Sequence, residues 1–290
     1  MGCRTKKSDS KLTLPSKPYV LQFSYDSFQP VNVFDICQSL GLTVRFIDIN
    51  MEGMYISQNS GKHPTVLISS KRPLARRVYT CGHELGHHVF GHGSRMDILA
   101  DHTSGSGSYD NDEWLADTFA GLLLMPIASV IGEFNRRNWK PETASQMDYY
   151  IISTFFGVGF QTLVSHCRIH RIVSEHRAAE LLKTSTARLL AGIKGLRILA
   201  APFKVIDGIS APSTIDLETS NYLFLPEDVK VEGDHIQELC SSSLGKVFMA
   251  KKPGILRISS DSLDFGSFLR IQNLGYVGLS ENRHLENDID

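Results

Sequence analysis

The sequence predicts an α+β protein in three parts. The first part combines a small β-sheet with a helix that carries the pattern His-Glu-x-x-His. The second part is a helical, helix-turn-helix-like domain, and the third is a small C-terminal α+β domain. Three observations indicate this plan: the His-Glu-x-x-His pattern lies on an amphipathic stretch, Gly157-Val158-Gly159 separates two helical patterns, and short apolar runs alternate with turn residues after Pro202.

The composition is typical of a globular protein from a reducing compartment. A chain of 290 residues has room for one large domain or roughly two to three small ones. Its five cysteines are odd in number and form no Cys-x-x-Cys pair, which favours the cytosol over a disulfide framework. A net charge of −1 gives no general attraction to nucleic acid or to a membrane surface. No apolar run approaches the roughly 18 residues of a membrane span, so we expect a cytoplasmic protein without a membrane partner.

The N-terminal elements follow from turn residues around short apolar runs. Residues 1–15 are charged and are expected to form a disordered tail, and residues 16–27 alternate like a short strand or an extended lead-in. A helix is predicted from Pro30 to about residue 40, where Gly41 ends it. Strands are predicted at 42–47, 54–57 and 65–68. Either 54–57 or 65–68 could bind an extended peptide at the sheet edge by β-augmentation, and an ordinary covered edge is the competing interpretation.

The next element, a helix from residue 74 to about 90, contains His83-Glu84-Leu85-Gly86-His87. Residues four apart lie on one helix face, about 6 Å apart along the axis, so His83 and His87 can bind one tetrahedral Zn²⁺. Glu84 lies beside them, where it can take a proton from water and pass it to a leaving amine. An apolar stripe projects roughly 180° away from the histidines and predicts packing on a core; its members are Leu74, Val78, Leu85 and Val89.

A second helix is predicted from residue 113 until Pro126 ends it. A catalytic zinc needs a third protein ligand and an open fourth position, and Glu113 is the candidate for that ligand. Asp117 lies one turn further on, where its carboxylate can accept the free N–H of a ligating histidine and fix its tautomer. Small Ala116 and Ala120 would allow this helix to approach the histidine helix closely.

Residues 93–112 predict a long loop between these two helices, rich in Gly, Ser, Asp and His. A loop of this length inside a compact domain is uncommon and often functional. His102 and Tyr109 are therefore candidates to stabilise the transition state by hydrogen bonding to a tetrahedral oxyanion. A mobile loop without a catalytic role is the alternative.

His92 is an alternative third zinc ligand. It would complete a longer zinc-peptidase pattern, His-Glu-x-x-His-x-x-Gly-x-x-His, in which the third histidine follows the second by about six residues. In this sequence His92 follows His87 by five residues, and Phe90 stands where the pattern needs glycine. We therefore predict that His92 is not a ligand but a helix-end cap or a cleft residue.

Taken together, these motifs resemble the ImmA/IrrE family of bacterial metallopeptidases. The similarity rests on His-Glu-Leu-Gly-His-His at 83–88, on Glu-Trp-Leu-Ala-Asp-Thr-Phe-Ala at 113–120 and on Leu-Leu-Met-Pro at 123–126. Upstream, Pro-Val-Asn-Val-Phe-Asp-Ile at 30–36 is also similar to that family, so the resemblance covers roughly residues 28–127. The spacing of Glu113 and Asp117 is similar to the glutamate-zincin pattern as well, in which the Glu binds zinc and the following Asp supports a His.

The resemblance implies a zincin-like metallopeptidase domain with one Zn²⁺ per chain. It also implies a protein substrate, most often a transcriptional repressor with a helix-turn-helix, in a stress response or a mobile-element circuit. These expectations come from the family and not from the composition or spacing of this chain.

Helices are predicted at 147–156 and 160–170, joined by the Gly-containing turn, which matches helix-turn-helix geometry. On that basis the second helix could contact DNA through Gln161, Ser165, Arg168 and His170. The competing interpretation is a helical domain that packs on the peptidase and supports a partner. We favour it because the chain has no net basicity. Residues 171–198 are expected to continue as helix.

The region after Pro202 shows short strand patterns and one helical stretch at about 234–242. The predicted domains are therefore a tail at 1–15, a zinc metallopeptidase domain at 16–140, a helical domain at 141–199 and a C-terminal α+β sensor or regulatory domain at 200–290. Two rival functions stay open: a DNA-binding regulator with a vestigial peptidase domain, and a partner that binds its repressor without cutting it. The presence of Glu84 argues against the first, because an inactive site needs no base.

Overall fold

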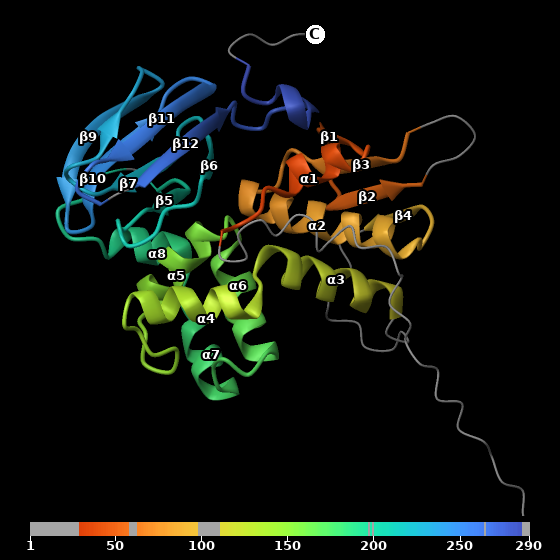
Figure 1. Ribbon diagram of the computed structural model, residues 1–290, viewed down its shortest axis with the longest axis horizontal. Helices are drawn as coiled ribbons and strands as arrows, with labels where there is room; N and C mark the ends of the chain where they lie inside the picture. The colour runs from red at the N-terminus through yellow and green to blue at the C-terminus, as the bar shows by residue number, and fades with distance from the viewer. Residues whose placement is uncertain are drawn as a thin grey trace, which may run out of the picture.

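The computed structural model describes residues 29–57, 63–97, 111–196, 198, 200–263 and 265–285. The chain is a mixed α+β structure in which three β-sheets flank a group of helices (Figure 1). The mixed α+β prediction is thereby confirmed. The tail predicted at 1–15, the lead-in at 16–27 and the loop candidates His102 and Tyr109 lie outside the described residues.

A five-stranded sheet with the order β13-β1-β3-β2-β4 supports the N-terminal part. Its strands are β1 (Thr43–Ile47), β2 (Gly53–Ile56), β3 (Thr65–Ser69), β4 (Arg95–Asp97) and β13 (Gly278–Leu279). β1 and β3 run parallel, and the other pairs are antiparallel. The edge prediction was wrong: β2 and β3 each have a neighbour on both sides, and within the described residues the edges are β4 and β13. Both edge strands come from segments that local patterning did not assign to this sheet.

Two helices lie against this sheet, α1 (Val33–Ser39) and α2 (Leu74–Phe90). Asn32 caps α1, because its side-chain oxygen accepts from the backbone N–H of Phe34 and of Asp35, both at 3.1 Å. α2 begins after Pro73 and ends at Gly91, which has a φ of 71° and therefore takes the left-handed conformation that glycine tolerates best. The apolar side of α2 packs into the core with the sheet.

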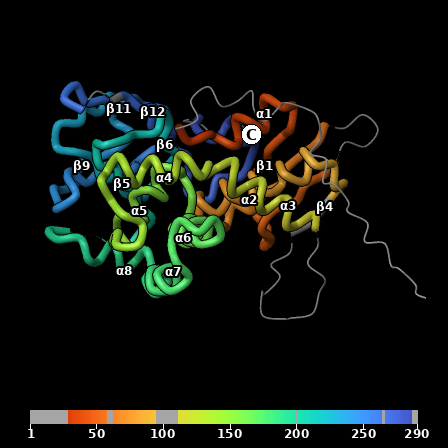
Figure 2. The backbone as a smooth tube through the Cα atoms, turned by 60° about the horizontal axis from the view of Figure 1, so that its bottom comes forward, coloured from red at the N-terminus to blue at the C-terminus, as the bar shows by residue number. Residues whose placement is uncertain are grey.

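Helix α3 (Asn111–Leu124) packs directly against α2 in both views of the chain (Figure 1 and Figure 2). Small residues allow this approach: Ala116 and Ala120 are fully buried, and a Cβ built on Gly86 would lie 2.9 Å from Ala116 Cα. The helical stretch Asn111–Arg136 is long and apolar enough to cross a membrane by length and composition alone, which the apolar runs of the sequence did not predict. Pro126 divides it into α3 and α4 (Ile127–Arg136).

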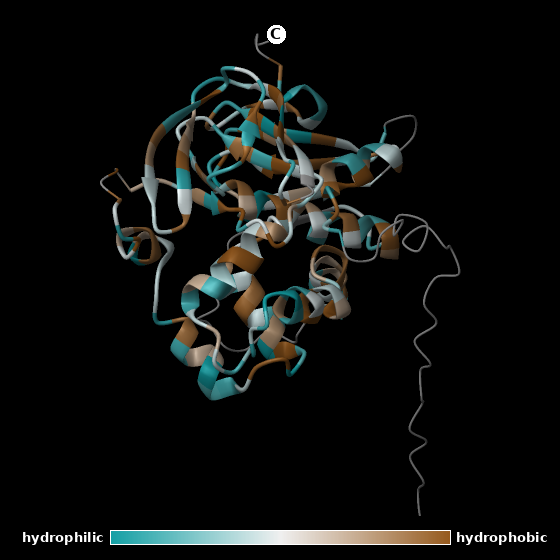
Figure 3. Ribbon diagram, turned by 60° about the vertical axis from the view of Figure 1, so that its left-hand side comes forward, coloured by the Kyte–Doolittle hydropathy of each residue, from teal (hydrophilic) through white to brown (hydrophobic). Residues whose placement is uncertain are grey.

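The middle of the chain folds into short helices, α5 (Gln146–Phe155), α6 (Phe160–Ile169), α7 (Glu175–Leu181) and α8 (Thr186–Ala191). Figure 3 shows hydrophobic and hydrophilic segments alternating along helices of the molecule, as expected where one helix face enters a core. The continuous helix predicted after residue 171 was wrong. Ser174 and Ser185 instead cap two separate short helices, because each hydroxyl accepts from a backbone N–H three residues on.

Two four-stranded sheets form the C-terminal part, with the orders β5-β7-β10-β9 and β6-β12-β11-β8. Their bounds are β5 (Phe203–Val205), β6 (Thr214–Glu218), β7 (Tyr222–Leu225), β8 (Lys230–Val231), β9 (Ile236–Ser242), β10 (Gly245–Ala250), β11 (Gly254–Ser260) and β12 (Phe265–Gln272). The helix predicted at 234–242 was wrong, because this segment is β9, paired antiparallel with β10. The expected small α+β domain is therefore corrected to an all-β unit over the described residues 200–272.

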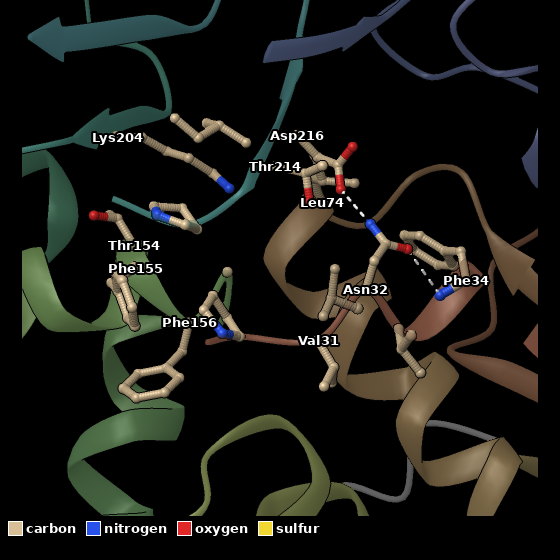
Figure 4. Close-up of a pocket in the computed structure, with 16 residues that line it drawn as sticks. Val31, Asn32, Phe34, Leu74, Thr154, Phe155, Phe156, Lys204, Thr214 and Asp216 are labelled. Atoms are coloured by element: carbon tan, nitrogen blue, oxygen red, sulfur yellow. Dashed lines mark hydrogen bonds between the residues drawn. The ribbon is translucent and has the colours of Figure 1, made fainter. Parts of the chain in front are cut away.

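Buried ionic contacts join the C-terminal part to the N-terminal part. Arg77 of α2 pairs with Glu218 of β6, and both side chains are almost fully buried. Asp216 of β6 accepts hydrogen bonds from Arg270 Nε at 2.9 Å and from Asn32 Nδ2, also at 2.9 Å (Figure 4). The two parts are thus fixed to each other through charged groups as well as apolar contacts.

The chain end returns to the N-terminal sheet. β13 pairs antiparallel with β1, and the short 3₁₀ helix η2 (Ser280–Asn282) follows it. Arg283 then places its guanidinium over the ring of Phe34 in α1, at 5.0 Å. Residues 278–285 therefore support the N-terminal sheet, although the sequence predicted them within a separate C-terminal domain.

A small cavity of about 40 Å³ lies where α1, α2, α5 and the C-terminal strands meet. Figure 4 shows Lys204 and Phe156 on one side of it and Asn32, Leu74 and Asp216 on the other. Burial lowers the pKa of Lys204. The residues of the His-Glu-x-x-His pattern do not line this cavity.

Candidate metal centre

The structure brings His83, His87 and Glu113 together. Each offers one ligand atom, and these atoms all lie within 4.8 Å of one another. His83 Nε2 is 3.0 Å from His87 Nε2 and 3.1 Å from Glu113 Oε2, and His87 Nε2 is 3.5 Å from Glu113 Oε1. The two histidines are buried on α2, and Glu113 reaches them from the first turn of α3.

These separations suit a tetrahedral metal ion. With zinc bonds of about 2.0–2.1 Å, the edges of a coordination tetrahedron are about 3.3–3.4 Å long. The two histidine nitrogens are 3.0 Å apart, and they lie 3.1 and 3.5 Å from different oxygens of the Glu113 carboxylate. Two imidazole lone pairs that face each other at this distance repel unless a proton or a cation lies between them. Two nitrogens and a carboxylate oxygen are also the donor types that zinc prefers. The residues therefore fit a zinc ion.

Asp117 lies where the sequence suggested. Its Oδ1 is 2.9 Å from His83 Nδ1, and a carboxylate can only accept at that distance. The hydrogen of His83 is thus on Nδ1, and Nε2 directs its lone pair toward His87 and Glu113. This is the tautomer that a metal ligand needs.

His92 contacts His87, the second histidine of the cluster. His92 Nδ1 is 2.9 Å from His87 Nδ1, and His92 Nε2 is 3.5 Å from Asp112 Oδ1 on α3. The ring of His92 stacks on Phe90, with centroids 5.6 Å apart and an interplanar angle of 18°. His92 therefore lies beside the cluster of His83, His87 and Glu113 and contacts it through His87.

Glu84 is completely buried on α2 beside the two histidines. The backbone of β2 comes close to it at Gly53, where an added Cβ would lie 2.7 Å from Glu84 Oε1 and 2.5 Å from Thr80 Cγ2. Only glycine leaves room for the Glu84 carboxylate at this point. Sequence reasoning missed the role of Gly53, because the pairing of strand and helix is a tertiary contact.

A second polar pair lies near the C-terminal end of α2. Tyr55 Oη is 2.8 Å from His88 Nδ1, and the two rings meet edge to face at 5.5 Å. Burial raises the pKa of Tyr55 and lowers that of His88, so both side chains stay neutral near pH 7. The pair links β2 to the metal helix.

The four residues suggested for DNA contact lie on or just after α6. Gln161 and Arg168 are exposed, whereas Ser165 and His170 are half-buried. Arg168 Nη1 pairs with Glu175 Oε2 at 3.2 Å, which offsets part of its charge. DNA binding through this face stays a prediction.

Comparisons with known proteins agree with the geometry. Residues 37–167 match the family model Peptidase_M78, described as the IrrE N-terminal-like domain. The matched segment contains α1 from Cys37 on, all three residues of the cluster (His83, His87 and Glu113), and α5 with most of α6. A search of curated proteins found no match.

Proposed function

We propose that this chain, whose residues 37–167 are an IrrE N-terminal-like domain of the Peptidase_M78 family, is a zinc-dependent endopeptidase. One observation carries the proposal. The donor atoms of His83, His87 and Glu113 converge within 4.8 Å, and Glu84 directly follows His83 on the same helix. A peptidase family supports the reaction class, and the ligand set supports the metal.

Different residues would perform the separate tasks of peptide hydrolysis: metal binding, proton transfer and orientation of a ligand. His83, His87 and Glu113 would hold one zinc ion, which supplies Lewis acidity that polarises a peptide carbonyl and acidifies water. Glu84 takes the proton from the attacking water and then donates it to the nitrogen of the leaving amine. Asp117 keeps His83 in the tautomer that presents Nε2.

Within the described residues β4 has a neighbouring strand on one side only, so this edge of the sheet could take an extended substrate. β4 pairs with β2 on one side and follows directly from the end of α2. A peptide that adds to the free side of β4 would form main-chain hydrogen bonds alongside the metal helix. β4 thereby takes the place of β2 and β3 as the proposed peptide-binding strand, because β2 and β3 are interior strands of the sheet.

Substrate identity rests on the family alone. We propose a cytoplasmic regulator that cleaves a transcriptional repressor, most often one with a helix-turn-helix, in a stress or mobile-element response. Specificity would come from docking of the substrate on the helical and C-terminal parts, since the metal centre itself recognises only a peptide bond.

The test compares zinc-loaded wild type with Glu84→Gln, incubated with the helix-turn-helix repressor encoded nearest to this chain's gene and with a whole-cell protein extract. New N-termini are identified by mass spectrometry. We expect termini that appear with wild type and fall about 10²–10⁴-fold with Glu84→Gln, while both proteins bind zinc equally.

If zinc-loaded wild type produces no new N-termini in either mixture, the endopeptidase proposal is wrong. Capture of the repressor without cleavage would then favour the alternative, a regulator that binds DNA or a repressor and whose metallopeptidase domain does not cut.

A further inference from the structure

We infer that Asp112, His92 and His87 form a relay, with an ion-pair contact from Asp112 to His92 and a hydrogen bond between His92 and His87, in which His92 is a positioning residue for the zinc ligand His87. The inference rests on the proposed metal site and concerns residues that the ligand pattern does not contain. It assigns a role to the histidine that the motif spacing excluded from the zinc.

The turn at the end of α2 brings His92 back into contact with His87. Gly91 adopts φ 71°, and the backbone N–H of His92 then donates to the carbonyl of His87 at 3.0 Å. This is a helix-ending turn in which the chain folds back over its own last turn. The side chain of His92 is thereby returned to His87 instead of continuing away from the site.

The hydrogen positions follow from the partners. A ring nitrogen that faces another ring nitrogen at 2.9 Å requires one donor and one acceptor. Because His92 Nε2 faces the carboxylate of Asp112 at 3.5 Å, its hydrogen belongs on Nε2 and its Nδ1 is the acceptor. His87 therefore donates from Nδ1, which leaves its Nε2 lone pair directed at His83 and Glu113.

The ring of His92 is held firmly. Its side chain is only 8% exposed, and it stacks on Phe90, which in turn meets Phe119 of α3 edge to face at 5.9 Å. A fixed ring loses little further freedom when it accepts the hydrogen bond. His92 can therefore set the orientation of His87 with little entropic cost.

Helix α3 supplies the carboxylates that support the two histidines, and it also supplies the proposed ligand Glu113. Asp117 orients His83 directly, Asp112 acts on His87 through His92, and Glu113 belongs to the ligand set. The two histidines of the cluster thus differ, since one contacts a carboxylate and the other contacts an imidazole. Loss of the relay should allow the His87 ring to rotate or to change tautomer, which weakens zinc binding.

The experiment measures zinc affinity of the full chain by competition with a chromophoric chelator, and it needs no substrate. His92→Phe keeps an aromatic ring for the stack but removes the acceptor. His92→Asn places an amide oxygen near the position of Nδ1. We expect zinc affinity about 10–100-fold lower in His92→Phe, with most of it restored in His92→Asn. The exposed His176 of α7 supplies the control, His176→Phe, which should match wild type.

Two further readouts separate positioning from general damage. Thermal unfolding of the metal-free proteins should differ little between His92→Phe and His92→Asn. The visible absorption of the Co²⁺-loaded proteins should change in His92→Phe and return toward wild type in His92→Asn, because Co²⁺ absorption reports on coordination geometry. Asp112→Asn should produce a smaller loss of affinity in the same direction.

Equal zinc affinity in wild type and His92→Phe would overturn the relay while leaving the zinc site intact. Failure of wild type itself to bind zinc would instead contradict the proposed function. An affinity loss in His92→Phe that His92→Asn does not reduce would also overturn the relay, since it would show that only the volume or packing of the ring matters.

Discussion

Asp117 lies outside the cluster of donor atoms and contacts His83, one of its three residues. Its Oδ1 accepts from His83 Nδ1 at 2.9 Å. Asp117→Ala should weaken zinc binding about 10–100-fold, the usual effect of losing such a partner, in a chelator competition assay. Asp48, an exposed residue that pairs with Lys71 at 2.9 Å, provides the control, and Asp48→Ala should leave the affinity unchanged. Identical zinc affinity in Asp117→Ala would show that the contact does not orient His83.

His166 of α6 is buried against Gly121 of α3. Burial, and then the neighbouring His170, lowers the pKa of His166 to about 4. The unfolded chain binds a proton at this histidine near its ordinary pKa of about 6.5, whereas the folded chain does not. The stabilisation is therefore complete above pH 6.5 and is lost as the pH falls from 6.5 toward 4.

Within that window, His166 should lower the free energy of unfolding by about 1.4 kcal/mol for each unit by which the pH falls. Urea unfolding of wild type and His166→Gln between pH 7 and pH 4.5 measures this pH dependence of the free energy of unfolding. We expect the variant to be less stable at pH 7 but to show a shallower decline. Parallel declines would mean that His166 does not titrate differently in the folded state.

At the scale of helices, alanine substitutions at two glycines of α2, Gly86 and Gly82, should have opposite effects on stability. A Cβ on Gly86 would lie 2.9 Å from Ala116 Cα, a backbone atom of α3 that cannot move aside. A Cβ on Gly82 would meet Ala120 Cβ and Leu124 Cδ1 at an ordinary 3.4 Å, and alanine favours a helix over glycine by about 1 kcal/mol.

We therefore expect Gly86→Ala to lower the free energy of unfolding by about 1–3 kcal/mol and to weaken zinc binding, because it moves Glu113 away from the histidines. Gly82→Ala should be neutral or slightly stabilising. Thermal unfolding with and without zinc distinguishes the two. If both variants behaved alike, the close packing of α2 on α3 would be contradicted.

Local sequence patterns predicted an element correctly where burial of one of its faces determines its secondary structure. The apolar stripe predicts a helix from residue 74 to about 90, the range that α2 occupies, Leu74–Phe90, and small Ala116 and Ala120 predict its close contact with α3. The pattern failed for β9, where pairing with β10 overrides a helical local sequence. It also failed for β13, because a two-residue strand has no period to detect.

At the scale of the whole molecule, the buried pair Arg77–Glu218 joins the metal helix to the C-terminal sheets. Breaking a buried pair leaves an uncompensated charge and costs about 3–5 kcal/mol, so Glu218→Gln should be strongly destabilising in chemical unfolding. The exposed pair Lys230–Asp261 supplies the control, and Asp261→Asn should change stability by less than about 1 kcal/mol. A loss below about 1 kcal/mol in Glu218→Gln would show that this contact does not hold the parts together.

Asp216 forms a second such contact. Burial alone would raise its pKa, but Arg283 and Arg270 lower the pKa well below its ordinary range. Two distant sequence segments supply these arginines, one on β12 and one at the chain end. No local signal in the sequence connects them, so the joint between the parts could not be predicted from it.

The candidate metal centre was easier to predict than the fold around it. His83, Glu84 and His87 share one helix, so their spacing alone predicts their relation. Glu113 followed from the need for a third ligand and from its place on the next helix. His92 and Gly53 act through tertiary contacts, a backward turn and a strand–helix approach, which spacing does not reveal.

The central claim is that His83, His87 and Glu113 hold one zinc ion. The most direct measurement is elemental analysis of wild type and Glu113→Gln after zinc loading and removal of excess metal. We predict close to one zinc per wild-type chain and a large loss in Glu113→Gln, with both proteins folded by circular dichroism. A metal-free wild type, or zinc content unaffected by Glu113→Gln, would contradict the assigned ligand set.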